Sequence, residues 1–234
     1  MKTFFAFISK LNSLFLFGIL ASVLLLVALG VWSGLKDQRK DVVAVSDASG
    51  TKVKLRFHLE EVKDIPGANA QMLKLTATAV KPGFAYSDYE RDTRNILFLT
   101  GDERVARWIF PHQNNVIHNA GQLQSKADTE KSQSSDNPTK ALYFEYSDKD
   151  TNSDGEISKD DQISLGLSKP DGEDFVTVLT GIDRLFSVSM LGDRTISVLY
   201  QTGKIFRHAL FPVATLAKAS DRVIVAIPDV EYRE

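Results

Sequence analysis

A repeat of apolar and polar side chains with a period of two residues constrains the fold of this chain more than any other feature. In KVKLRFHLEEV, Lys52 to Val62, the apolar side chains of Val53, Leu55, Phe57 and Leu59 alternate with Lys, Arg and His. Such alternation is typical of a β-strand with one buried face. The pattern therefore predicts a sheet, with its apolar positions directed into a core.

Further short segments of this kind follow along the chain. Each is rich in β-branched or aromatic residues and is bounded by Gly, Pro, Asp or Asn: MLKLTATAV, NILFLTG, RVARWIFP, ALYFEYS, QISLGLS, FVTVL, LFSVSML, RTISVLY, KIFRHALFP and RVIVAIP. Regularly spaced short strands predict an all-β domain, either a sandwich or a propeller-like fold of about ten short strands. Two segments, TGDERVARWIFP and TGKIFRHALFP, are weakly similar to each other, as repeated blades of a propeller would be.

Local turn and helix patterns refine this prediction. Lys-Pro-Asp-Gly at 169–172 predicts a turn, because Pro170 presets φ and Gly172 tolerates a left-handed conformation. VATLAKAS, Val213 to Ser220, is the one segment beyond the N-terminal region where we expect a short helix.

A polar stretch divides the predicted strands into two groups. HNAGQLQSKADTEKSQSSDNPT, His118 to Thr139, lacks aromatic residues and is rich in Ser, Gln, Asn, Asp and Lys. Such a segment cannot bury enough apolar surface to order itself. We therefore expect a first β-strand group at 51–117, a flexible loop at 118–139 and a second β-strand group at 140–234.

An uncharged apolar run precedes the strands. No residue between Lys10 and Lys36 is charged, and LFLFGILASVLLLVALGVWSGL fills most of this interval. A helix needs roughly 20 apolar residues to span a bilayer, so we expect a short N-terminal tail at 1–12, a transmembrane helix at 13–35 and a linker at 36–50. A cleaved signal peptide is the alternative, although its apolar region is shorter, about 7–15 residues.

The apolar run also carries small residues at four-residue spacing. Gly18 and Ser22 form one such pair, and Gly30 and Gly34 form another. This spacing lets two membrane helices approach closely, so a homo-oligomer formed through the helix is one expectation. The alternative is that Gly and Ser are simply common in membrane helices.

Composition excludes several classes of function. The chain has no cysteine, which excludes disulfides, thiolate metal sites and thiol catalysis. Its 28 Lys and Arg residues nearly balance its 30 Asp and Glu residues, which gives no electrostatic basis for binding nucleic acid. We therefore expect no nucleic acid among the partners.

The most specific chemical motif is DTNSDGEISKDD, Asp150 to Asp161. In calcium loops, oxygen ligands at alternate positions converge on the ion, a glycine provides a sharp turn, and an acid ends the loop. With Gly155 at the turn and Ile157 directed to the core, the spacing predicts a Ca²⁺ site formed by Asp150, Asn152, Asp154, Glu156, Ser158 and Asp161. The alternative is a solvated turn, because Asp, Asn, Ser and Gly are the common turn residues.

This segment resembles the calcium loops of EF-hand and dockerin proteins, and the resemblance covers residues 150–161 only. It implies that oxygens at the matching positions bind calcium, with Glu156 contributing its backbone carbonyl. Two features depart from the EF-hand pattern: the last position is Asp161 rather than Glu, and the flanking segments look like strands rather than paired helices. We therefore expect a fixed structural ion that braces a strand-to-strand connection, rather than a helix-opening switch.

The side of the membrane that holds the β-domain follows from the expected strength of this site. Lysines and arginines flank the apolar run on both sides, and counting them leans slightly toward a cytoplasmic domain. A single calcium loop that ends in Asp is nevertheless expected to bind weakly, with a Kd of roughly 10⁻⁵ to 10⁻³ M, and would stay empty in the cytosol. We expect a single-pass inner (plasma) membrane protein whose C-terminal domain is extracytoplasmic, in the periplasm.

No catalytic motif accompanies this loop. The four histidines, His58, His112, His118 and His208, lack the spacing of a zinc site, and no nucleophile elbow, phosphate loop or dinucleotide fingerprint occurs. We therefore expect a non-catalytic interaction or assembly module that has envelope protein partners and is held to the membrane by its N-terminal helix. The alternatives are an extracytoplasmic ligand-binding or sensing domain and a hydrolase with an unrecognised site.

Overall fold

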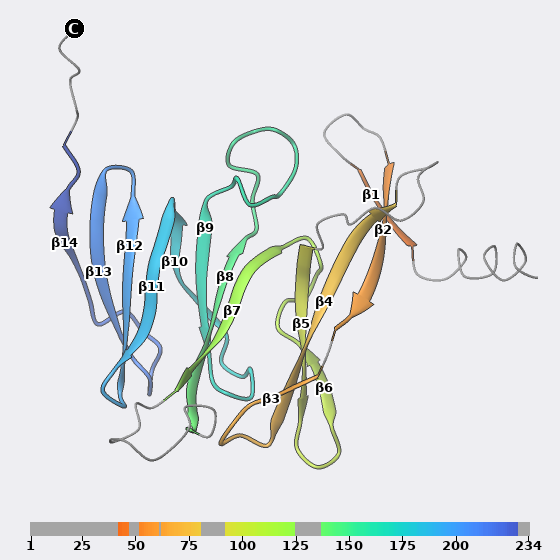
Figure 1. The fold of residues 1–234 in the computed structure, drawn as a ribbon, viewed down its shortest axis with the longest axis horizontal. Helices are drawn as coiled ribbons and strands as arrows, with labels where there is room; N and C mark the ends of the chain where they lie inside the picture. Colours follow the sequence, from red (N-terminus) through yellow and green to blue (C-terminus); the bar gives the residue numbers. More distant parts are fainter. Residues whose placement is uncertain (1–41, 47–51, 61, 81–91, 125–136, 229–234) are drawn as a thin grey trace, which may run out of the picture. The chain divides into compact units, whose positions relative to one another are not determined.

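The computed structural model describes residues 42–46, 52–60, 62–80, 92–124 and 137–228, and every regular element in these ranges is a β-strand (Figure 1). The described strands from Val43 onward belong to one compact unit. The predicted tail and transmembrane helix, 1–35, lie outside the described residues. No helix among the residues that are described is long and apolar enough to cross a membrane.

The strands are numbered in chain order. Their bounds are β1 Val42–Ser46, β2 Lys52–Leu59, β3 Lys63–Asp64, β4 Ala70–Val80, β5 Asp92–Thr100, β6 Val105–Trp108, β7 Val116–Gln124, β8 Thr139–Ser147, β9 Ile163–Ser168, β10 Val176–Ile182, β11 Arg184–Leu191, β12 Thr195–Thr202, β13 Ile205–Pro212 and β14 Ser220–Ala226.

Neighbouring strands pair in an antiparallel, largely sequential order. One sheet has the order β1-β2-β4-β5-β7-β8-β9-β10, with β3 on β4 and β6 on β5, and the second sheet has the order β11-β12-β13-β14 (Figure 1). Strands β5 and β7 are joined at one register pair among the described residues, Thr93 with Ile117. The larger sheet therefore consists of a first group, β1–β6, and an inner group, β7–β10; we call β11–β14 the outer sheet.

Strand β8 shows how the inner group is buried on both faces. Ala141 belongs to the apolar cluster shared with the outer sheet, whereas Leu142, Phe144 and Tyr146 belong to a second cluster shared with β4 and β5. This is the period-two alternation of a strand, with apolar residues on both faces. Burying a large apolar side chain contributes about 1.5–3 kcal/mol, so both clusters hold the inner group in place.

The outer sheet is buried on one face. In β12, Ile196, Val198 and Tyr200 are buried against the inner group, and the residues between them are only partly covered. This matches the alternation predicted from the sequence.

The predicted turn at 169–172 is confirmed. Gly172 has φ 77° and donates its backbone N–H to the Lys169 carbonyl at 2.9 Å, which closes the turn before β10. The φ value is one that a glycine adopts without strain.

The predicted loop at 118–139 is wrong at both ends. Residues 118–124 belong to β7, and Thr139 begins β8; residues 125–136 lie outside the described residues. The prediction failed because β7 needs few apolar side chains of its own. Val116, Ile117 and Leu123 are buried, while the backbone ladder with β8 satisfies the polar segment between them.

Two further predictions need correction. Val213–Ser220 forms no helix: Leu216, with φ 54°, closes an isolated turn through its N–H and the Pro212 carbonyl at 2.8 Å, and Ser220 begins β14. Leu216 is buried in the core at 4% exposure, so tertiary packing fixes this turn. The predicted linker 36–50 includes β1, which pairs with β2.

Candidate calcium loop

The candidate calcium loop, residues 150–161, lies in the connection between β8 and β9. These two strands are antiparallel neighbours, with Tyr146 opposite Ser164 at the end that carries the loop. The connection extends beyond the strand ends (Figure 1). An ion in this loop would therefore sit at the end of the inner group, between two paired strands.

Asp161 closes the loop upon its own beginning. Its Oδ1 atom accepts hydrogen bonds from the Thr151 N–H at 2.6 Å, the Thr151 hydroxyl at 3.0 Å and the Asn152 N–H at 3.3 Å. Its Oδ2 atom accepts one from the Ser158 N–H at 2.9 Å. Asp161, the last residue of the motif, is thus hydrogen-bonded to Thr151 and Asn152 near its start and to Ser158 in its second half.

Asp150 fixes the sharp turn in the middle of the loop. Its two carboxylate oxygens accept the N–H groups of Ser153 at 2.7 Å and Gly155 at 2.8 Å. Gly155 has φ 88°, which is accessible to glycine without a Cβ clash. Ser153 has φ 62°, and its hydrogen bond to Asp150 helps to hold that less common conformation.

Asn152 and Asp154 continue this arrangement at alternate positions. Asn152 Oδ1 accepts the Asp154 N–H at 2.9 Å, and Asp154 Oδ1 accepts the Glu156 N–H at 2.8 Å. Because an oxygen of a carboxylate or amide has two lone pairs, each of these atoms keeps acceptor capacity after one hydrogen bond.

The second half of the loop is anchored more deeply than the first. Ile157 and Ser158 are half-buried, whereas the side chain of Glu156 is exposed. The Ser158 hydroxyl accepts the Asp160 N–H at 3.1 Å. Asp161 is the most buried of the predicted ligands, at 4% exposure.

The environment of Asp161 favours its ionised form. Burial alone would raise the pKa of this carboxyl, but hydrogen bonds from Ser158, Thr151 and Asn152 outweigh that effect and hold the pKa below the ordinary value for aspartate. Hydrogen bonds to the charged form of a carboxyl lower its pKa in this way. Asp161 is therefore a charged, buried acceptor at neutral pH.

Residues outside the motif tie the loop to the rest of the domain. Gln162 donates its N–H to the Thr151 hydroxyl at 2.8 Å, and its side-chain amide donates to Asp183 Oδ1 at 3.0 Å. Asp183 lies between β10 and β11 and also accepts the Gly203 N–H. The base of the loop is thus hydrogen-bonded to the outer sheet, a connection the sequence pattern did not reveal.

His118 lies beneath the same loop. Its Nε2 atom is 2.8 Å from the Ser147 hydroxyl, which donates to the Gln162 carbonyl at 3.1 Å. Burial, and then the charge of Lys159, lower the pKa of His118, although Asp92 and Asp161 oppose the shift. The imidazole is therefore uncharged at neutral pH and serves as a packed strand residue.

The donor chemistry of the loop fits a hard cation, because carboxylate, amide, hydroxyl and carbonyl oxygens are the ligands that Ca²⁺ prefers. Within the described ranges, however, no three acidic or histidine side chains are gathered closely enough to hold a metal. The Asn152 amide also donates to Asp154 Oδ2 at 2.8 Å. A cation would have to replace that hydrogen bond and draw the carboxylates inward.

Two histidines in the part of the chain that the structure describes lie beside serine hydroxyls. His208 Nε2 is 2.9 Å from the Ser197 hydroxyl, as His118 is close to Ser147. Neither histidine has an acidic hydrogen-bond partner there to orient its ring, which a Ser-His-Asp arrangement requires.

Comparison with protein-family models, with curated proteins and with solved structures finds no match to this chain.

Proposed function

We propose that this protein is a membrane-anchored, calcium-binding β-domain that acts as a non-catalytic interaction or assembly module of the cell envelope. The observation that carries the proposal is the closed form of the loop at 150–161. Asp161 binds the start of the loop, and oxygens at alternate positions turn toward the loop backbone. Asp161 is ten residues from Thr151, so this hydrogen bond joins the two ends of the loop.

Calcium would be held by the side chains of Asp150, Asn152, Asp154, Ser158 and Asp161 and by the carbonyl of Glu156. Three of the side-chain ligands, Asp150, Asp154 and Asp161, are carboxylates, and carboxylates brought together repel one another. The ion would supply the positive charge that offsets this repulsion and would brace the connection from β8 to β9. The role is structural, because the flanking elements are strands with fixed register.

The proposal places the anchor at 13–35 and the β-domain on the extracytoplasmic side. The argument for this side is the expected weak affinity, roughly 10⁻⁵ to 10⁻³ M, which only calcium concentrations outside the cytosol would satisfy. A C-terminal reporter that is active on one side of the membrane alone tests this placement; activity on the cytoplasmic side would contradict it.

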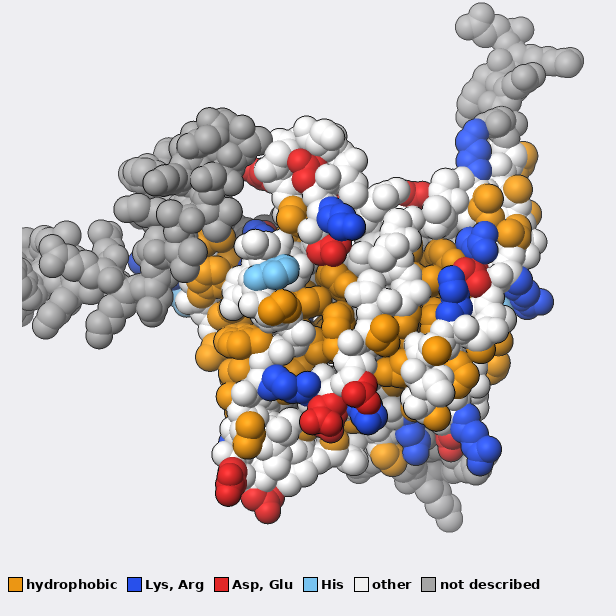
Figure 2. Space-filling model, turned by 180° about the vertical axis from the view of Figure 1, so that it is seen from behind, with side chains coloured by type: hydrophobic (Ala, Val, Ile, Leu, Met, Phe, Trp, Pro, Cys, Tyr) orange, Lys and Arg blue, Asp and Glu red, His pale blue; other side chains and the backbone are white. Residues whose placement is uncertain are grey.

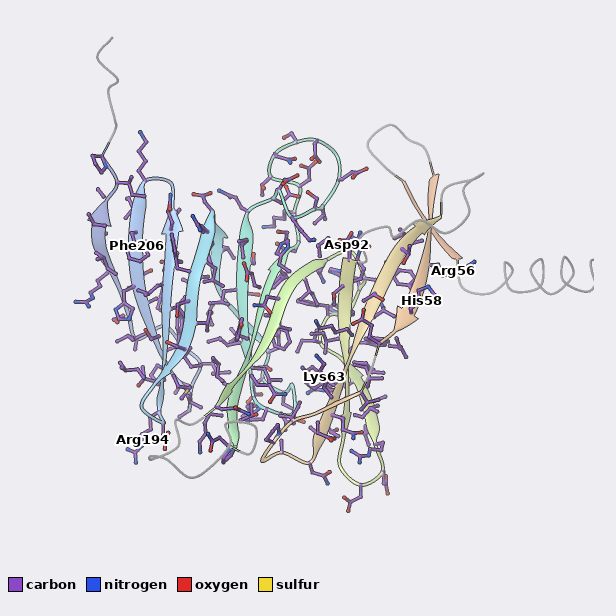
Figure 3. All side chains as sticks on the ribbon, in the orientation of Figure 1. Arg56, His58, Lys63, Asp92, Arg194 and Phe206 are labelled. Carbon is purple, nitrogen blue, oxygen red and sulfur yellow. The ribbon has the colours of Figure 1, made fainter. Side chains whose placement is uncertain are left out.

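An apolar region on the outer sheet supports the interaction role. Phe206, which Figure 3 labels on β13, packs edge-on against Phe186 of β11, with ring centroids 5.1 Å apart. Arg184 lies over the Phe186 ring, 4.9 Å from its centroid. Val225 of β14 lies opposite Phe206 in the sheet. We call this the outer patch: Arg184, Phe186, Phe206 and Val225.

The edge beside this patch is also apolar. Val223, Ile224, Val225 and Ile227 are each 43–53% exposed, and Figure 2 shows hydrophobic atoms next to Lys and Arg side chains on this edge. Strand β14 ends the sheet, so one side of its backbone has no neighbouring strand among the described residues. Exposed strand edges and large apolar patches are typical of protein-binding surfaces.

Calcium-dependent stability of the purified full chain tests the function. We expect thermal unfolding to shift upward in Ca²⁺ relative to chelator, because a ligand at a hundredfold excess over its Kd stabilises by about 2.7 kcal/mol. The double variant Asp150→Asn with Asp154→Asn should lose this shift. Asp193→Asn, in the exposed turn between β11 and β12, is the matched control and should keep it. Equal melting of the parent chain with Ca²⁺ and with chelator would refute the proposal.

A further inference from the structure

A second feature of the domain is a cleft between β10 and the strands of the outer sheet. Its volume is about 350 Å³, and its apolar wall includes Val178 and Leu179 of β10 and Ile205 of β13. A volume of this size falls at the lower end of the range for small-molecule sites. The cleft shares none of its lining with residues 150–161.

The polar side of the cleft is a hydrogen-bonded cluster centred on Asp221. Its carboxylate accepts hydrogen bonds from Arg207 Nε at 2.9 Å, from the Tyr200 hydroxyl at 2.9 Å and from Lys218 Nζ at 3.2 Å. Arg207 Nε also donates to the Tyr200 oxygen at 3.2 Å. All four residues line the cleft.

This cluster has more donors than it uses. The hydrogen bonds of Arg207 with described residues all involve Nε, which leaves both Nη groups for another acceptor. Lys218 has three ammonium hydrogens, one of which bonds to Asp221. The charges of Arg207 and Lys218 exceed that of Asp221 by one positive charge.

Asp221 holds the Arg207 guanidinium in place rather than competing with it for a ligand. Burial would raise the pKa of Asp221, but the hydrogen bonds from Arg207, Tyr200 and Lys218 keep it below the ordinary aspartate value. The side chains of Arg207 and Asp221 are 27% and 15% exposed, so the pair is partly withdrawn from solvent. A fixed guanidinium loses less freedom on binding than a mobile one.

We propose that this cleft binds a small monocarboxylate with a short apolar body. The Nη groups of Arg207 receive the carboxylate as a planar fork, and Lys218 adds a second positive contact. Val178, Leu179 and Ile205 cover the apolar body.

The charge balance selects a monoanion over a phosphate. One negative charge neutralises the single excess positive charge of the cluster, whereas a dianionic phosphate would leave a net negative charge beside Asp221. The planar fork of arginine matches both groups in shape, so the net charge decides between them.

Titration of the purified full chain with hexanoate tests the proposal, with methyl resonances of Val, Leu and Ile as the readout. We expect saturable shifts of the Val178, Leu179 and Ile205 methyl groups with hexanoate and none with hexanamide, which has the same body without the charge. Inorganic phosphate should bind more weakly than hexanoate. Calcium is held constant, so the result does not depend on the calcium loop.

Substitutions locate the binding groups. Arg207→Gln and Lys218→Gln should each raise the Kd for hexanoate, the former by roughly tenfold or more because it removes a charged, forked contact. Arg222→Gln, an exposed cation on β14 outside the cleft, is the control and should leave the Kd unchanged. Lys218 is 45% exposed, so its variant keeps the test decisive if Arg207→Gln does not fold. Non-saturable shifts, equal binding of hexanamide, tighter binding of phosphate, or a Kd insensitive to Lys218→Gln would overturn the proposal.

Discussion

Among the single residues of the candidate site, Asp161 has two roles, although its position in the motif predicts only one. It is a predicted calcium ligand, and it also accepts the hydrogen bonds that close the loop. Its partner Thr151 stands at a position that supplies no ligand in the EF-hand pattern. The carboxylate that closes the loop is therefore also one of the proposed calcium ligands.

Asp161→Asn should destabilise the domain in chelator, by about 2 kcal/mol, because hydrogen bonds to a charged acceptor are each worth roughly 1.5–3 kcal/mol. The folded-state pKa of Asp161 is lowered, so its contribution is present above the unfolded-state pKa and is lost as pH falls through the folded-state value. Urea denaturation at pH 7 and at successively lower pH measures the free energy of unfolding of the parent chain and of the variant. The difference between these two free energies should shrink with acidification. Asp160→Asn, exposed and adjacent, is the control. A variant as stable as the parent at pH 7 would show that Asp161 does not close the loop.

Among the secondary-structure elements, the sequence predicted the strands and turns that local residue patterns determine. It missed those that depend on contacts with neighbouring strands or distant residues. The strands with apolar alternation, such as Lys52–Leu59 and Thr195–Thr202, and the turn at Gly172 follow from side-chain periodicity and backbone preference. Strand β7 was missed because its polar centre is ordered by pairing with β8. The closure of the candidate calcium loop depends on a contact between Thr151 and Asp161, which spacing alone does not specify.

Gly172, in the turn before β10, allows the cost of backbone conformation to be measured separately from the cost of side-chain packing. A Cβ atom at Gly172 would lie 2.7 Å from Cδ2 of buried Phe98, whereas at Gly192 it would meet nothing within 4 Å. Both glycines have positive φ, 77° and 63°. Gly172→Ala should therefore cost about 1–3 kcal/mol more than Gly192→Ala, the difference being the overpacking of Phe98. Equal losses in chemical denaturation would mean that Phe98 moves aside without cost.

At the scale of the whole β-domain, the three strand groups differ in how fully they are covered. The inner group is buried on both faces, while the outer sheet is buried on one and carries the outer patch on the other. Six of the exposed large hydrophobic residues lie in or beside the outer sheet without lining the cleft: Phe186, Leu191, Val223, Ile224, Val225 and Ile227. Surface apolar residues gathered in this way are consistent with the proposed interaction role.

Val225→Asp should abolish partner binding while leaving the domain folded. Val225 is 51% exposed on the edge strand and lies opposite Phe206, so a charge there disrupts an apolar contact surface without entering the core. Chemical cross-linking in membranes, followed by immunoblotting of the full chain, should show a discrete adduct with the parent that the variant lacks. Val105→Asp, a 59% exposed valine on β6, is the matched control and should retain the adduct. Equal thermal melting of both variants establishes that folding is intact. A specific contact at β14 predicts that Val225→Asp loses the adduct and that Val105→Asp keeps it. If both variants lose the adduct, or if both keep it, the outer patch is not the binding surface.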